Sequence, residues 1–193
     1  PNGGATAFND TSTLATWLHQ EGYRTGLFGK YLNRYSTIAP YIPPGWDEWH
    51  AFDLDRGIYF NYPMVENGVI VNYGSSVQNY STDVIAEKAV QFIETNTVTQ
   101  PFFLYFTPFA PHASDTPGVG DPAIPAPVDN GTFFSLAAWR PPSYNEANVS
   151  DKPAWVKAQP LISQSTSVFH DNTRIKQIES LQAVDRAVER IVN

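Results

Sequence analysis

The chain contains no cysteine among its 193 residues. It can therefore form no disulfide, no thiolate metal site and no cysteine nucleophile within these residues. Cations are also scarce and scattered: 12 Lys and Arg face 19 Asp and Glu, for a net charge of −7. This balance argues against a basic face for nucleic acid. The longest apolar run, residues 101–111, is broken by prolines and is about half of a membrane span.

Proline, glycine and aromatic residues are abundant by contrast, with 16 Pro, 12 Gly and 14% Phe, Trp and Tyr. This composition is typical of a globular protein with long ordered loops, and the length suits one domain with a sizeable core. The chain begins at Pro1 without a methionine, and we therefore expect it to be a piece of a longer protein.

The first pattern along the chain is a helix followed by a strand. Asp10, Thr11 or Ser12 can cap the helix, and Gly22 suits its left-handed end. Leu14, Trp17 and Leu18 lie at the spacing i, i+3 and i+4 of one helix face. Residues 24–32 then favour a strand.

Asn67-Gly68 lies between two apolar runs and predicts a β-hairpin. Pro63 in the first arm lacks an N–H, so we expect that arm at a sheet edge or in an irregular segment. A second helix is predicted over residues 81–96, with a buried stripe of Ile85, Ala89, Phe92 and Ile93.

The apolar segment 101–112 predicts a strand buried on both faces of a parallel sheet. Residues 113–165 favour a long irregular loop. A last helix is expected from about Thr173 to Val192, with one apolar face formed by Ile175, Ile178, Leu181, Val184, Val188 and Ile191. This order predicts an α/β fold with a mainly parallel sheet flanked by helices.

Two side chains follow the predicted strands where reactive groups gather in parallel sheets, namely Lys30 and His112. A lysine offers a fixed charge to an oxyanion, and a histidine can move a proton near neutral pH. Together they suit the transfer of a charged tetrahedral group. Taken singly, each has a simpler interpretation: a solvated rim lysine and a hydrogen-bonding loop histidine.

The surrounding pattern decides between these interpretations. Residues 22–30 read Gly-Tyr-x-Thr-x-x-x-Gly-Lys, which resembles the second signature of the sulfatase family. The resemblance continues through "PPGWDEWHAF", the helix "YSTDVIAEKAVQFIE", the Ala-Pro-His of "PFFLYFTPFAPH" and the helix "SLQAVDRAVERIV". The sequence of these segments is most similar to the branch of N-acetylglucosamine-6-sulfatases and heparan-type sulfatases. It covers most of residues 1–193, which we interpret as the central part of an alkaline-phosphatase-like catalytic domain.

The resemblance implies roles for several residues. Lys30 would grip the sulfate oxygens, and Gly29 would allow close backbone approach. His112 would contact the sulfate or bridging oxygen and protonate the departing alcohol. Asn33 would offer an amide to the substrate, although a turn at the end of the strand is the simpler interpretation. The nucleophile would be a formylglycine polarised by a divalent cation, usually calcium, which prefers carboxylate and amide oxygens.

Other parts of the family pattern are missing. The nucleophile motif Cys or Ser-x-Pro-x-Arg does not occur, and Leu32 stands where many sulfatases have a histidine. We expect the nucleophile and two metal-binding aspartates before Pro1, and an Asp-Asn pair and a second lysine after Asn193. We therefore assign no metal ligand here, and expect the chain alone to be inactive and to bind calcium weakly. Sheet edges exposed by such a division would favour self-association.

Two alternatives remain open at this point. A phosphatase or phosphodiesterase of the same superfamily would use the same lysine and histidine. A carbohydrate-binding module could instead use Trp46, Trp49, Tyr59, Tyr62 and Tyr73 as a stacking platform, although packing is the preferred interpretation of these aromatics. The expected partner is a sulfated small molecule or glycan, not nucleic acid. A periplasmic or extracellular location is favoured, and the particular ester is not defined by the sequence.

Overall fold

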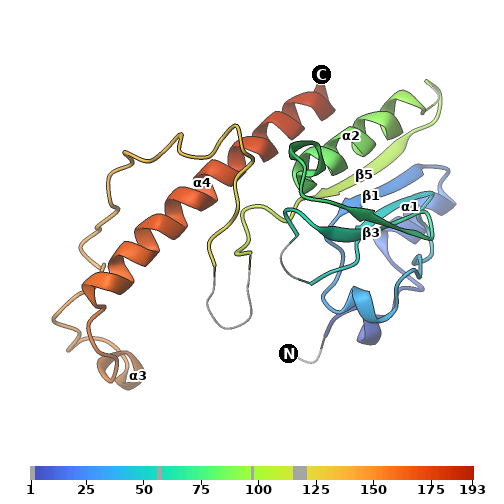
Figure 1. Cartoon of the computed structure of the whole chain (residues 1–193). Coiled ribbons are helices and arrows are strands. Elements are labelled where there is room, and N and C mark those ends of the chain that lie inside the picture. The colour runs from blue at the N-terminus through green and yellow to red at the C-terminus, as the bar shows by residue number, and fades with distance from the viewer. Residues whose placement is uncertain (1–2, 56–57, 97, 115–120) are drawn as a thin grey trace.

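The computed structural model describes residues 3–55, 58–96, 98–114 and 121–193. In these residues five strands form one sheet with the order β4-β3-β2-β1-β5, and the C-terminal part of the chain extends away from this sheet to one side (Figure 1). The strands are β1 (Arg24–Gly29), β2 (Glu48–Phe52), β3 (Tyr62–Glu66), β4 (Val69–Tyr73) and β5 (Phe102–Thr107). β1 pairs in parallel with β2 and β5, whereas β3 pairs antiparallel with β2 and β4. The α/β class is confirmed, with a mixed rather than a mainly parallel sheet.

Helices lie on both faces of this sheet. The α-helices are α1 (Leu14–Gln20), α2 (Ser81–Glu94), α3 (Ala154–Lys157) and α4 (Gln164–Val192), and the short 3-10 helices are η1 (Ala5–Ala7), η2 (Tyr35–Thr37) and η3 (Val77–Asn79). α2 packs against the sheet, and the C-terminal part of α4 lies beside α2 (Figure 1). None of the described helices is both long and apolar enough to cross a lipid bilayer.

Two apolar clusters hold the layers together, because successive residues of a strand point to opposite faces. Phe28 of β1 packs with Ile85, Ala89 and Phe92 of α2 on the face of the sheet that α2 covers. Leu27, its neighbour, packs on the other face. There the cluster also contains Tyr35, Trp49, Ala51 and Val65. The stripe expected on the second helix is confirmed for the three α2 residues named here, which are all buried.

The predicted hairpin joins β3 to β4. Asn67 has a φ of 47° and Gly68 a φ of 89°, the left-handed pair that a tight two-residue turn requires. The expectation for Pro63 is wrong, because β3 lies inside the sheet between β2 and β4. Pro63 is tolerated because it lies beyond the last residue pair of β2 and β3. There its carbonyl accepts from the Asp53 amide at 3.0 Å, and only the return bond is missing.

The first helix begins later than predicted. Its N-cap is Thr13, whose side chain and backbone exchange hydrogen bonds with Thr16 in a capping box. Leu14 and Trp17 are exposed, and Ala15 and Thr16 are the buried residues. Of the three apolar residues at helical spacing, only Leu18 is partly buried. Gly45 explains the choice of face: its backbone comes so close that a Cβ there would lie 2.6 Å from the Thr16 nitrogen.

The last strand and the last helix also differ from expectation. β5 pairs with β1 only and is an edge strand of the described sheet, with Phe102 and Tyr105 exposed. It is thus not buried on both faces. α4 begins at Gln164, nine residues before the expected start, and its buried positions include Glu179, Ala183 and Ala187 rather than Leu181 and Val188, which are exposed. Residues 121–153 are irregular, as predicted, and part of this segment runs beside α4 (Figure 1).

Candidate active site

Three parallel strands end at one edge of the sheet. Lys30 directly follows β1, Asp53 directly follows β2, and His112 comes five residues after the end of β5. β1 lies between the other two strands. The groups that follow these strands therefore gather at the edge where parallel sheets carry their ligands.

Gly29 brings β1 and β5 into close contact at this edge. Its φ is +127°, and a Cβ placed on it would lie 2.0 Å from the Thr107 carbonyl oxygen. The same oxygen accepts a hydrogen bond from the Lys30 amide at 2.7 Å. The close approach of the β5 backbone therefore requires a glycine at position 29. This requirement is separate from the approach of substrate that the family resemblance implies.

The ammonium of Lys30 is held by a carboxylate that the sequence analysis did not select. Lys30 Nζ donates to Asp55 Oδ1 at 2.8 Å, and the Arg34 amide donates to the same oxygen at 2.8 Å. Both side chains of the ion pair are partly buried. An ammonium has three N–H donors, so this bond orients the group and leaves donors for an anion. Asp55 follows β2, a strand that the sequence analysis did not predict, so no pattern in the sequence pointed to this residue.

Asp53 is a second carboxyl group at this edge. One of its oxygens, Oδ1, is buried and has no hydrogen-bond partner in the described structure. Burial and the nearby Asp55 carboxylate raise the pKa of Asp53. Asp53 therefore holds a proton more readily than an ordinary aspartate.

His112 is exposed on the loop after β5, and its backbone is firmly positioned. Its carbonyl accepts from the Tyr59 hydroxyl at 2.6 Å, its amide donates to the Phe109 carbonyl at 2.9 Å, and its ring lies 4.8 Å from the Phe109 ring. Nδ1 contacts the Ala113 carbonyl at 2.8 Å. Because a carbonyl only accepts, Nδ1 carries a hydrogen and Nε2 is the nitrogen that can exchange a proton.

The buried Tyr59 is a positioning residue that the sequence analysis had placed among the aromatics of a sugar platform. Burial raises the pKa of Tyr59, so its hydroxyl stays a donor to the His112 loop. Trp49, Tyr59 and Tyr62 are buried in the apolar clusters. The packing interpretation of these three aromatics is therefore confirmed.

Asn33 lies three residues beyond Lys30 and is exposed. Its carbonyl accepts from the Ala5 amide at 2.8 Å, so its backbone anchors the N-terminal segment. In the described residues its side chain makes no hydrogen bond, and its predicted role in binding substrate stays a prediction. Metal binding has no support in these residues: no group of three or more His, Asp or Glu side chains in the described ranges could hold an ion.

The model of the sulfatase family matches residues 5–193. The chain belongs to the sulfatase family. Members of this family are hydrolases that act on sulfate esters.

Individual relatives match almost the whole of this sulfatase chain. An extracellular sulfatase homologue of Drosophila melanogaster is 33% identical over 97% of the chain, and the human N-acetylglucosamine-6-sulfatase is 30% identical over 89%. The match spans only 16% and 30% of those two proteins. The chain thus corresponds to a minor part of the length of these relatives.

Solved structures share the fold. One, a protein in complex with its substrate D-glucosamine-2-N,6-O-disulfate, superposes with a TM-score of 0.69 at 18% identity. The superposition covers 96% of this sulfatase chain and 47% of that one. At this identity the likeness shows the fold alone.

Proposed function

We propose that the protein carrying this chain hydrolyses sulfate esters of sulfated carbohydrates or aryl alcohols in a periplasmic or extracellular compartment. The observation that carries the proposal is the pair of groups at neighbouring strand ends, Lys30 after β1 and His112 after β5, in a chain of the sulfatase family. Support for a glycan substrate and for an extracellular site comes from the relatives, which include an extracellular sulfatase and an N-acetylglucosamine-6-sulfatase.

In this proposal Lys30 binds the sulfate. The bond to Asp55 holds the ammonium in place at 2.8 Å, so less side-chain freedom is lost when an anion binds. The remaining N–H groups of the ammonium then donate hydrogen bonds to the sulfate oxygens, which stay negatively charged through the reaction. Asp55 is accordingly a positioning residue for Lys30.

His112 delivers the proton that the departing alcohol needs. When the bond between sulfur and the bridging oxygen breaks, the leaving alkoxide takes the proton from Nε2, while Nδ1–H stays on the Ala113 carbonyl. Water supplies the oxygen that sulfur gains, and the products are the alcohol and sulfate. The described residues form no cage for a metal, so no step is assigned to one. We expect a formylglycine nucleophile and calcium to depend on residues outside this chain.

The test uses the full-length protein with 4-nitrophenyl sulfate. We expect Lys30→Met to lower kcat/KM by about 100–1,000-fold, and His112→Gln to lower it by a similar factor of about 100–10,000. Lys157→Met and His170→Gln are matched controls, since both residues are exposed and lie on helices away from these strand ends. Full activity in either site variant would refute its role.

A second readout separates the alternatives. His112→Gln should retain more activity towards aryl sulfates with good leaving groups than towards alkyl sulfates, since a good leaving group needs less protonation. Faster turnover of the matching phosphate monoester would favour phosphoryl chemistry. Glycan binding without turnover that survives Lys30→Ala and His112→Ala would favour a binding module.

Two further expectations concern the isolated chain. We propose that residues 1–193 alone turn over no sulfate ester, because these residues contain no nucleophile motif. The free edge of β5, with Phe102 and Tyr105 exposed, would favour self-association of the isolated chain. Light scattering over a wide range of concentrations checks the latter, and a monomer throughout contradicts it.

A further inference from the structure

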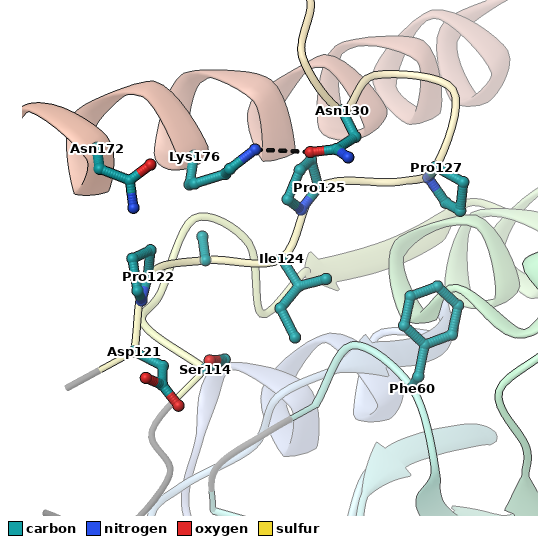
Figure 2. Close-up of a pocket in the computed structure, with 11 residues that line it drawn as sticks. Phe60, Ser114, Asp121, Pro122, Ile124, Pro125, Pro127, Asn130, Asn172 and Lys176 are labelled. Atoms are coloured by element: carbon teal, nitrogen blue, oxygen red, sulfur yellow. Dashed lines mark hydrogen bonds between the residues drawn. The ribbon is translucent and has the colours of Figure 1, made fainter. Parts of the chain in front are cut away.

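A cleft lies beside the His112 loop, between residues 121–127 and α4 (Figure 2). Its volume is about 610 Å³, within the usual range of about 300–1,000 Å³ for ligand sites. Two wall residues connect it to the candidate active site. Ser114 is two residues beyond His112, and Phe60 follows Tyr59, whose hydroxyl holds the His112 carbonyl.

The wall of the cleft is firmly built. The Ser114 amide donates to the Asp121 carbonyl at 3.0 Å, and the Tyr80 hydroxyl donates to the Ile124 carbonyl at 2.9 Å. Ala123 and Ala126 of the same segment are buried in the main apolar cluster. A cleft with fixed walls loses little freedom when it binds a ligand.

Lys176 on the opposite side is also held in place. Its Nζ donates to Asn130 Oδ1 at 2.6 Å and to Glu179 Oε2 at 2.8 Å (Figure 2 shows the first bond). Glu179 is fully buried and accepts from the Gly131 and Phe133 amides as well. The carboxylate balances the lysine charge, so the ammonium offers an oriented N–H rather than a strong unpaired charge.

Three polar residues with unused hydrogen-bonding capacity line the cleft, Asn172 and Lys176 on α4 and Asp121 on the opposite wall (Figure 2). The Asp121 carboxylate and the Asn172 amide make no side-chain hydrogen bond within the described residues, and Lys176 keeps one of its three N–H donors. Prolines 122, 125 and 127, with Phe60 and Ile124, supply apolar surface (Figure 2). Acceptors and donors above an apolar wall match a pyranose ring, which has hydroxyl groups at its rim and C–H groups on its faces.

We propose that this cleft binds an uncharged sugar ring of the glycan, next to the sulfated ring at Lys30 and His112. The inference rests on the proposed sulfatase function and adds a subsite to it. Asp121 would accept from ring hydroxyls, and Asn172 and Lys176 would donate to them. A second sulfate is disfavoured here, because the Asp121 carboxylate would repel it and Glu179 already balances Lys176.

The test compares two substrates of the full-length protein: a sulfated disaccharide whose second ring is uncharged, and 4-nitrophenyl sulfate, which has no second ring. For the disaccharide we expect Asn172→Ala to lower kcat/KM by about 3–10-fold and Asp121→Asn by about 10–100-fold, through KM. For the aryl sulfate both variants should stay within about twofold of the unchanged protein. Asn72→Ala on β4 and Asp185→Asn on α4, both exposed, are the matched controls.

Each outcome decides the matter. Equal losses on both substrates, or no loss on the disaccharide, would overturn the subsite. If neither substrate is turned over, the proposed function fails. Calorimetry with the unsulfated disaccharide then tests the cleft alone: binding weakened by Asp121→Asn supports it, and absence of binding overturns it.

Discussion

Replacing Gly29 by alanine tests the close contact that sets the position of Lys30. The added Cβ would lie 2.0 Å from the Thr107 carbonyl oxygen, 2.6 Å from its carbonyl carbon and 2.9 Å from its Oγ1. The first two atoms belong to the backbone of β5, so no side-chain rotation relieves the contact. The φ of +127° is unfavourable for alanine as well.

These effects set the expected loss of stability. Backbone strain contributes about 1–2 kcal/mol, overpacking about 1–3 kcal/mol, and loss of the bond from the Lys30 amide to Thr107 about 1 kcal/mol. Together they lower the free energy of unfolding by about 3–6 kcal/mol, a large part of the total for a domain of this size. Separation of β1 from β5 would also move Lys30 away from the His112 loop.

Gly22→Ala is the matched control. Gly22 has a comparable positive φ of +85°, but a Cβ there meets nothing within 4 Å. Gly22→Ala should therefore lower the free energy of unfolding through backbone strain alone, by about 1–2 kcal/mol. Urea unfolding followed by circular dichroism measures both variants, and 4-nitrophenyl sulfate reports activity in the full-length protein. Equal losses in the two variants would refute the reasoning, since the contact with Thr107 would then contribute nothing.

The other predictions concern two buried polar groups. Burial and the nearby Lys88 ammonium lower the pKa of His50. Below about pH 6.5 the unfolded chain therefore binds a proton at His50 that the folded chain does not bind, and the free energy of unfolding decreases as the pH decreases. His50→Gln should weaken this fall between about pH 7 and pH 5, and equal shifts of the urea midpoint in both proteins would contradict it. Glu179→Ala leaves two backbone amides without their acceptor and removes one of the two acceptors of Lys176, and it should lower the free energy of unfolding by about 3–5 kcal/mol. Glu189 is exposed, so Glu189→Ala should change the free energy of unfolding by no more than about 0.5 kcal/mol. Thermal unfolding of both variants measures the difference, and similar losses would count against the buried contacts of Glu179.

Local patterns predicted the elements well where the chemistry of one or two residues decides the backbone. Asn67-Gly68 forms the turn of the hairpin, and Gly22 ends the first helix with a positive φ, as expected. Patterns of burial were less reliable. Trp17 and Val188 follow helical periodicity, yet both are exposed, since periodicity does not say which face has a neighbour.

The residues of the candidate site could likewise be predicted only in part. Lys30 and His112 could be selected because each follows an apolar strand, and the wording around them resembles sulfatases. Asp55 and Tyr59, which hold those two residues, are 25 and 53 residues away from them in the sequence. No local pattern links partners at such separations.

The order of residues by itself determined the family, the hairpin and the order of the helices and strands other than β2 and α3, because turns, caps and signature motifs act over a few neighbouring residues. Only the tertiary structure decided that the β3 arm lies inside the sheet, that Asp55 holds the Lys30 ammonium, and that Asp121 and Asn172 line one cleft. Those facts depend on which strands pair and which loops meet. Strand pairing and loop contacts follow from the packing of distant segments against one another.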